Sequence, residues 1–283
     1  MSEEQVPVAP DMLARLERTA VELATLAGAE ITTSLGQTLS VRYKGGTEEA
    51  GFADPVSEVD HNTEVLIRAR LNDAFPTHGI LGEEMDAKAG ESDEFVWAVD
   101  PVDGTTNFVN GFPLFAASIG VLYRGRPLVG AIWCSCSHAL RPGVYHGTAG
   151  ACLCFDGERL TRRPNPALRR RLAGEPHAAA GHGDLDIRKT GSAAIECAYV
   201  AAGLLSVARF ERPNIWDVAA GIALVKAAGL EVYSAGDGAW HTFVDFPGET
   251  VRTWRHPLIL GEHDAVRAIV QQGGSAGYPD MIA

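Results

Sequence analysis

The sequence lacks three features that would place it in broad classes of protein. Its formal net charge is −12 at pH 7, which is the wrong sign for binding nucleic-acid phosphates. It contains no run of about 18 apolar residues, so we expect no membrane-spanning helix and no membrane partner. Its first ten residues, MSEEQVPVAP, lack the apolar segment of a secretory signal, which favours a cytoplasmic protein.

Cysteine is scarce, with five residues in 283. The odd number, together with the lack of a signal, argues against a disulfide framework. Four of the five form two C-x-C pairs, in the stretches WCSC and ACLCF. This spacing is shorter than the C-x2-4-C of structural zinc sites. Residues two apart on a strand share a face, so the sequence favours buried packing over a zinc site.

What is present is the composition of a globular protein, with 46% hydrophobic and 21% charged residues. Hydrophobic periodicity predicts helices over residues 10–34, 57–75, 191–205, 216–230 and 262–272, with short strands between them. We expect layered α and β structure (class α/β, α+β layered). The divisions are a disordered tip at 1–9, an N-terminal α+β subdomain at 10–165 and a C-terminal α/β subdomain at 166–283. Residues 167–189 carry no clear pattern.

The stretch WAVDPVDGTTNFVNGFP, residues 97–113, allows two interpretations. Asp, Pro and Gly after an apolar strand are ordinary turn residues. The same residues could hold a ligand: Pro101 stiffens the chain between Asp100 and Asp103, and Gly104 and Thr105 would begin a helix whose free N–H groups attract an anion. The stretch alone does not decide between them.

Other acidic residues also stand where strands end or helices begin. Glu83 and Glu84 end the GILGEE strand, and Asp217 lies in the first turn of the WDVAAG helix. Helix capping is a sufficient explanation for Asp217 alone. If the acids converge beside apolar elements, however, they require a cation to stay ionised. An all-oxygen ligand set favours Mg2+ over zinc, and a cation would also let this acidic protein accept a phosphate.

These motifs resemble those of the inositol monophosphatase family of Mg2+-dependent, lithium-sensitive phosphomonoesterases. The resemblance rests on five elements in the same order along the chain: DPVSEVD (54–60), GEE (82–84), WAVDPVDGTTNF (97–108), GSAAIECAYVAAG (191–203) and WDVAAG (216–221). It implies an αβαβα sandwich of the sugar-phosphatase type and a homodimer. It implies two or three Mg2+ ions, with Li+ as an inhibitor.

The resemblance also implies roles for single residues. One metal would be held by Glu83, Asp100 and the carbonyl of Val102, a second by Asp100, Asp103 and Asp217, and a weaker third by Glu83. Gly104 and Thr105 would bind phosphate. Thr105, bonded to Asp60, would help Glu83 activate the attacking water. Candidate contacts to the substrate are Asp103, Ser192, Ala193, Glu196 and Glu211, although Ser192 is equally well explained as a helix N-cap.

Three departures from the family pattern concern the substrate more than the chemistry. The lysine that often precedes the DPVSEVD element corresponds only to Lys44, across an expanded loop that contains Glu48 and Glu49. The glutamate that touches sugar hydroxyls in inositol-specific members is Phe210 here, with Glu211 beside it. The segment 161–190 is shortened. His182, within it, is better explained as a solvated loop residue than as part of a pocket.

The sequence therefore predicts an Mg2+-dependent phosphomonoesterase that acts on a small phosphorylated alcohol, by default inositol 1-phosphate. Histidinol phosphate, fructose 1,6-bisphosphate and 3'-phosphoadenosine 5'-phosphate are alternative substrates, the last least favoured. A protein-binding regulator that retains the fold is the alternative from another functional class.

Overall fold

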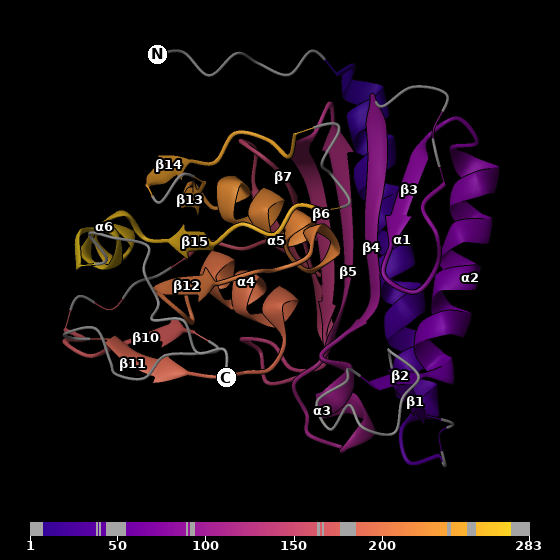
Figure 1. Cartoon of the computed structure of the whole chain (residues 1–283), viewed down its shortest axis with the longest axis horizontal. Coiled ribbons are helices and arrows are strands. Elements are labelled where there is room, and N and C mark those ends of the chain that lie inside the picture. The colour runs from indigo at the N-terminus through magenta and orange to yellow at the C-terminus, as the bar shows by residue number, and fades with distance from the viewer. Residues whose placement is uncertain are drawn as a thin grey trace.

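The structure, a computed structural model, describes residues 8–37, 39, 41–43, 55–88, 90, 94–162, 165, 167–175, 185–236, 239–247 and 253–272. Most of the expected N-terminal tip, the loop with Lys44, and His182 lie outside the described residues. Helices and sheets alternate in five layers, α–β–α–β–α (Figure 1). This confirms the layered fold class expected from the sequence.

A seven-stranded sheet forms the larger β layer, in the order β3-β4-β5-β6-β7-β8-β9. Its strands are β3 (Gly79–Gly82), β4 (Phe95–Asp103), β5 (Ala116–Tyr123), β6 (Arg126–Cys134), β7 (Gly143–Thr148), β8 (Leu153–Phe155) and β9 (Glu158–Arg159). Only β3 and β4 run parallel; each later strand is antiparallel to its neighbour. Strands β5 and β6 are buried almost throughout because helices cover both faces, which explains their continuous apolar sequences.

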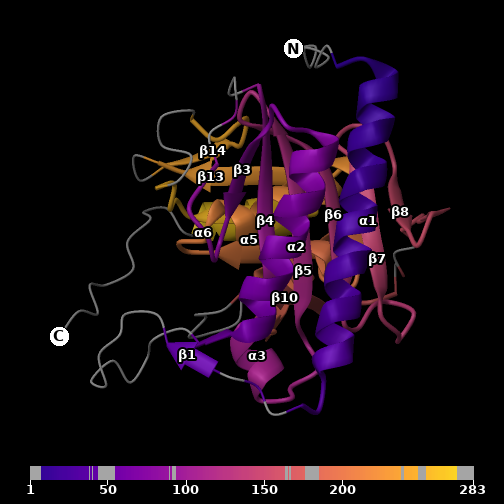
Figure 2. The same ribbon diagram turned by 90° about the vertical axis from the view of Figure 1, so that its right-hand side faces the viewer.

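Two long helices, α1 (Pro10–Ser34) and α2 (Glu58–Ala74), lie side by side on the outer face of this sheet (Figure 2). Their apolar sides form a core with the sheet, which includes Leu16, Leu23, Ile67 and Trp97. A short ribbon of β1 (Val41–Tyr43) and β2 (Pro55–Ser57) leads into α2. Ser57 and Asp60 form a capping box at the start of that helix.

The middle layer consists of α4 (Ala193–Ala202) and α5 (Ile215–Ala227), which pack between the two sheets. Helix α5 approaches the large sheet closely at Gly120 and Gly130, which are paired across β5 and β6. A Cβ at Gly130 would lie 2.2 Å from the carbonyl oxygen of Ala220, and one at Gly120 would lie 2.8 Å from the nitrogen of the same residue. Small residues on both surfaces therefore fix the depth of α5, and with it the position of Asp217 at its start.

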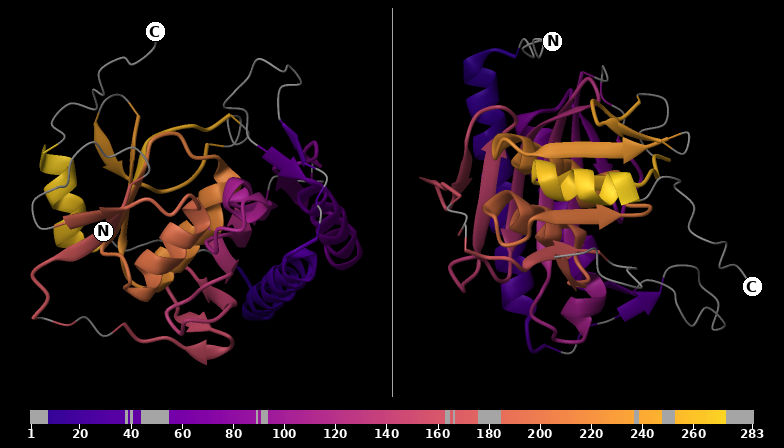
Figure 3. Two further views of the ribbon diagram at one scale, coloured as in Figure 1. Left: turned by 90° about the horizontal axis from the view of Figure 1, so that it is seen from below. Right: turned by 90° about the vertical axis from the view of Figure 1, so that its left-hand side faces the viewer.

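The smaller sheet has six strands in the order β11-β10-β12-β15-β13-β14. Their bounds are β10 (Arg171–Gly174), β11 (Leu185–Arg188), β12 (Val207–Phe210), β13 (Glu231–Ala235), β14 (Trp240–Thr242) and β15 (Leu258–Gly261). Helix α6 (His263–Gln272) covers its outer face (Figure 3). Strands β10 and β11 fall in the segment 167–189, to which the sequence pattern assigns no element.

The chain passes from the large sheet to the small one between β9 and β10, on either side of residue 165. The two sheets nevertheless share one buried core, because residues of both pack on α4 and α5, among them Ile132 and Leu260. Residues 175–184 join the parallel strands β10 and β11. This connection is shorter than the dozen or more residues that a parallel crossover usually needs.

Candidate active site

A β-bulge at the end of β4 brings two aspartates to one side of the strand. Asp100 pairs with Ser118 and Asp103 with Ala116, so the segment of β4 between them is one residue longer than that of β5. In a regular strand, residues three apart face opposite sides, and the extra residue removes that alternation. Pro101 has no N–H to donate and is tolerated at a bulge. The Val102 N–H donates to Asp100 Oδ1 at 3.0 Å, which fixes the turn.

The next residues turn the chain into a short helix, α3 (Thr105–Val109). Gly104 has φ +85°, and a Cβ there would lie 3.2 Å from the carbonyl oxygens of Gly191 and Leu114. The positive φ favours glycine at this position, and a side chain would also be tightly packed there. The hydroxyl of Thr105 lies 2.9 Å from Asp60 Oδ1 and 2.9 Å from the carbonyl oxygen of Val102. The Thr105–Asp60 hydrogen bond expected from the sequence is therefore present.

Asp60 is fully buried at the start of α2. Its other oxygen, Oδ2, accepts from the backbone N–H of Ser57 at 3.0 Å and from the Ser57 hydroxyl. Burial raises the pKa of Asp60, while the hydrogen bonds from Ser57 and Thr105 oppose that rise. The side chain is thus locked in place between the helix start and the Thr105 hydroxyl.

Glu83 and Glu84 follow β3 in a turn whose backbone is hydrogen-bonded to a buried ion pair on α2. Glu64 of α2 accepts from Arg68 Nε at 2.7 Å and from the Glu84 N–H at 2.8 Å. Arg68 in turn donates to the carbonyl of Met85 at 3.1 Å. Sequence reasoning missed this pair; the available signal was an acid and a base four residues apart on one helix.

Asp217 occupies the third position of α5. Its Oδ2 accepts from the backbone N–H of Asn214 at 2.7 Å and from Asn214 Nδ2 at 3.0 Å. The capping explanation for Asp217 is therefore correct, but it is incomplete, because the carboxylates of Asp103 and Glu83 also act on it electrostatically. The Ser118 hydroxyl donates to the carbonyl of Trp216 at 3.0 Å, which ties the start of α5 to β5.

The acids influence one another strongly. Burial raises the pKa of Asp100 well above its usual range, and the charges of Glu83, Asp103 and Asp217 raise it further. Burial likewise raises the pKa of Asp217. It raises the pKa of Asp103 to about 6, although hydrogen bonds from Ser192 and Ala194 oppose the rise. The full negative charge of such a group is therefore unfavourable for the fold, and a bound cation would offset it.

The start of α4 holds Asp103 in position. The Ser192 hydroxyl donates to Asp103 Oδ2, and the Ala194 N–H donates to the same oxygen at 2.7 Å. Ser192 also accepts from the Ile195 N–H at 3.2 Å, so it is the N-cap as well. Ala193, between them, is half-buried.

The two candidate glutamates for substrate contact lie in different surroundings. Glu196 is 2% exposed and accepts from the N–H of Thr190 at 3.2 Å and from its hydroxyl at 2.9 Å. Burial raises its pKa to about 7. Glu211 is half-buried and directly follows β12, whereas Phe210 before it belongs to the core. Of the two, Glu211 is the more accessible to a substrate.

The donor set fits hard divalent cations, because the grouped side chains offer only oxygen atoms. In the described part of the chain, no three His, Cys, Asp or Glu side chains stand in an arrangement that could hold a metal ion without rearrangement. Asp103 and Asp217 each have an oxygen that accepts from protein donors. A cation would bind the other oxygens of these carboxylates, and the protein donors would hold the carboxylates in orientation.

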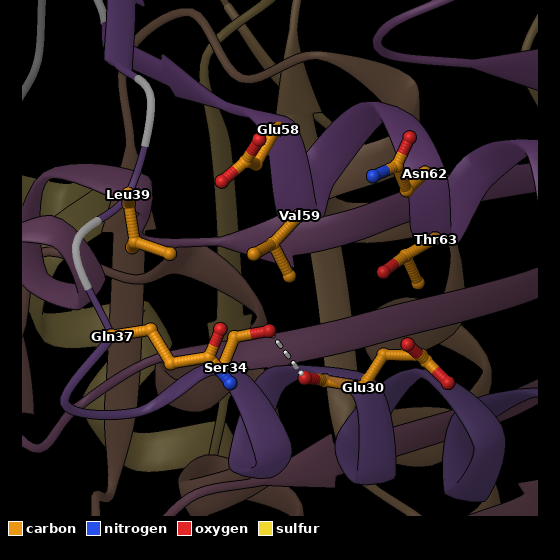
Figure 4. Close-up of a pocket in the computed structure, with 8 residues that line it drawn as sticks. All are labelled: Glu30, Ser34, Gln37, Leu39, Glu58, Val59, Asn62 and Thr63. Carbon is orange, nitrogen blue, oxygen red and sulfur yellow. Dashed lines mark hydrogen bonds between the residues drawn. The ribbon is translucent and has the colours of Figure 1, made fainter.

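A separate polar pocket of about 170 Å³ lies between the end of α1 and the start of α2 (Figure 4). It is lined by Glu30, Ser34, Gln37, Leu39, Glu58, Val59, Asn62 and Thr63. None of the grouped acids lines it, so it is distinct from the candidate site.

Comparison with known proteins identifies the family. The pattern of the inositol monophosphatase family matches residues 12–266. The chain belongs to this family. It is accordingly a phosphatase of the family, as the sequence motifs predict, and the family is metal-dependent and acts on small phosphorylated substrates.

Individual relatives carry several different names. An inositol-1-monophosphatase of Rhizobium meliloti is 34% identical over 89% of this chain and 94% of its own length. A fructose-1,6-bisphosphatase/inositol-1-monophosphatase of Aquifex aeolicus is 30% identical over 79% and 91%. The Nus factor SuhB of Vibrio cholerae is 30% identical over 89% and 93%.

Among solved structures, the extragenic suppressor protein suhB of Bartonella henselae superposes with a TM-score of 0.70 at 26% identity. The match covers 95% of this chain and all of the other. Within the described residues, none of the helices has the length and apolar character needed to cross a bilayer.

Proposed function

We propose that this chain is an Mg2+-dependent phosphomonoesterase that hydrolyses a small phosphorylated alcohol, with inositol 1-phosphate as the default substrate. The observation that carries the proposal is the bulge in β4, which places Asp100 and Asp103 in one electrostatic group with Glu83 and Asp217. Four carboxylates supplied by three separate segments are what a cluster of hard cations needs. A packing role alone would not favour two buried carboxylates, Asp100 and Asp103, beside two half-buried ones.

The residues that would hold the cations follow the family pattern. Glu83, Asp100 and the Val102 carbonyl would hold the first, and Asp100, Asp103 and Asp217 the second. A third would rest on Glu83. When bound, Mg2+ supplies a Lewis acid that acidifies water and stabilises the charge on the attacking and leaving oxygens.

The chain's own groups position water and phosphate. The Thr105 hydroxyl can donate to Asp60, which leaves its oxygen able to accept a hydrogen bond from the attacking water. As the water loses this proton to the Thr105 oxygen, the hydroxyl's own proton would pass to Asp60. Glu83 would orient the same water from the other side. The first amides of α3, from Gly104 and Thr105, would donate to the phosphate oxygens. Water attacks phosphorus in line, the P–O bond to the alcohol breaks, and the alcohol takes a proton from solvent.

A phosphate-release panel tests this proposal. The substrates are inositol 1-phosphate, histidinol phosphate, fructose 1,6-bisphosphate and 3'-phosphoadenosine 5'-phosphate, each with Mg2+ and with a chelator. We expect Mg2+-dependent release from inositol 1-phosphate, inhibited by Li+. Preferred release from another ester would reassign the substrate within the class. No release from any ester by protein that binds Mg2+ would refute a catalytic role on these substrates.

The name of the Vibrio cholerae relative, Nus factor SuhB, supports a second candidate: a protein-binding regulator that retains the fold. Asp103→Asn separates the two, because it removes a ligand charge while an Asn oxygen can still accept from Ser192 and Ala194. If a cellular phenotype of gene loss is rescued by Asp103→Asn, the function lies in protein binding. The homodimer and the cytoplasmic location remain predictions.

A further inference from the structure

Two thiols lie close together beside the edge of the large sheet. Cys152 directly precedes β8 and Cys154 is within it, and their Sγ atoms are 3.9 Å apart. In a tetrahedral zinc site with Zn–S bonds of about 2.3 Å, two sulfur ligands are separated by about 3.8 Å. Both cysteines are half-buried, so a cation can reach them. The pair thus has the spacing of two thiolate ligands of one ion.

His146 offers a third donor on the same face of the sheet. It pairs directly with Cys154 across β7 and β8, and residues opposed in this way have Cβ atoms about 4.5–5.5 Å apart. Its Nδ1 lies 2.8 Å from Glu17 Oε1. An ionised carboxylate only accepts hydrogen bonds, so Nδ1 carries a proton, and in the neutral ring Nε2 then keeps its lone pair. Nε2 is buried and has no hydrogen-bond partner among the residues that the structure describes.

Glu17 of α1 accepts a hydrogen bond from His146 in the way that a carboxylate commonly accepts from the second nitrogen of a metal-bound histidine. It is fixed a second time by the Thr148 hydroxyl, which donates to Oε2 at 3.1 Å. Such a carboxylate orients the ring and makes the other nitrogen a better ligand. Figure 2 shows α1 beside β7 and β8. Gly147, between His146 and Thr148, faces α5 instead, since a Cβ there would lie 3.1 Å from Ala227 Cβ. The thiols therefore lie across the sheet from α5.

We propose that Cys152, Cys154 and His146 form a binding site for a thiophilic divalent cation of the Zn2+ class, separate from the acidic cluster. A water molecule would complete the tetrahedron. In the described residues no three such side chains stand in an arrangement that could already hold a metal ion, so binding requires the His146 ring to move toward the two thiols while Glu17 keeps its hydrogen bond to Nδ1. Burial and the neighbouring Cys152 thiol raise the pKa of Cys154 to about 11, and Arg159, opposite it on β9, opposes this rise only in part. A bound cation must therefore displace the thiol protons, so binding should strengthen as pH rises.

Titration of the reduced, full-length protein with Cd2+ tests the site, because cadmium bound to thiolates has a charge-transfer absorption in the ultraviolet. Excess Mg2+ keeps the acidic cluster occupied throughout. We expect one Cd2+ per chain with this absorption, and Zn2+ should displace it. Absence of the absorption, or its persistence in both Cys152→Ser and Cys154→Ser, overturns the proposal.

The variants have matched controls. Cys136→Ser removes another half-buried thiol, in the second C-x-C pair, and should leave Cd2+ binding unchanged. Glu17→Gln should weaken Zn2+ binding about 10- to 100-fold while retaining the cadmium absorption. His146→Ala should weaken it at least as much. Equal binding in wild type and His146→Ala would exclude the histidine and overturn the three-donor site.

A second measurement needs no variant and therefore does not depend on variant folding. Wild-type protein is alkylated with iodoacetamide, with and without Zn2+, and the modified cysteines are identified by mass spectrometry. The proposal expects Zn2+ to protect Cys152 and Cys154 but not Cys136. Equal alkylation of all three with and without Zn2+ contradicts it, as does a Cys152–Cys154 disulfide that forms under reducing conditions and leaves no thiol to bind.

Discussion

Asp100 and Asp103 are three residues apart on β4, yet a one-residue bulge places both in the same acidic group. The bulge is what makes the turn DPVD a site: a regular strand would have pointed one of the two carboxylates into the opposite helix layer. Because both carboxylates are buried, their negative charges lower the free energy of unfolding when no cation is bound.

The destabilising effect of these charges predicts how the stability of the metal-free protein depends on pH. Burial raises the pKa of Asp103 to about 6 in the fold, against about 3.9 in an unfolded chain. The folded state therefore binds the proton more tightly, and stability falls as pH rises from about 4 through about 6. Asp100 and Asp217 have pKa values shifted in the same direction.

Asp103→Asn isolates this contribution. In a chelator, we expect the variant to melt at a higher temperature than wild type at pH 8 and at nearly the same temperature at pH 4.5. The gap should be a few degrees in Tm, since about 1 kcal/mol shifts Tm by a few degrees in proteins of this size. Saturating Mg2+ should close or reverse the gap, because only wild type gains the full binding energy. A gap that is independent of pH would contradict the assignment.

The Thr105 hydroxyl provides a prediction about catalysis. Thr105→Ala removes the group that lies 2.9 Å from Asp60, and we expect kcat to fall by about 10²- to 10⁴-fold, the usual contribution of a positioned proton-transfer group. Thr105→Ser should retain most of the activity. Thr106→Ala, at the exposed neighbouring position, is the matched control and should behave like wild type in steady-state kinetics. Equal losses at both positions would indicate damage to α3 and not a role for the hydroxyl.

The ion pair of Glu64 and Arg68 provides a prediction about stability. Arg68→Met leaves the fully buried Glu64 without its cation, and we expect a loss of about 3–5 kcal/mol in the free energy of unfolding. Removing both charges with Glu64→Gln and Arg68→Met should restore part of this stability. Urea denaturation of the two single variants and the double variant measures the coupling. Additive losses would show that the pair does not act as a unit.

The sequence predicts those parts of the site that depend on local signals. Ser57 and Asp60 are three residues apart at the start of an amphipathic helix, a spacing that indicates a capping box, and the box is present. Asp217 follows an equally local rule at the start of α5. The bulge could not be predicted, because it depends on how β4 and β5 pair and not on either strand alone. The contact of Ser192 with Asp103, 89 residues away, and the support of Glu84 by Glu64 arise only from packing of distant segments.

That long-range contact leads to the last prediction. Ser192 caps α4 and also donates to Asp103, so Ser192→Ala should have two separable effects. Loss of the cap should lower the free energy of unfolding by about 1 kcal/mol. Loss of the hydrogen bond to a proposed ligand should weaken Mg2+ binding about 10- to 100-fold, which appears as a higher Mg2+ concentration for half-maximal activity. Ser192→Asp can replace the cap but brings a second negative charge against Asp103, so stability and Mg2+ dependence should then change differently. If Ser192→Ala lowers stability but leaves the Mg2+ dependence unchanged, Ser192 is a helix cap and does not position Asp103 for metal.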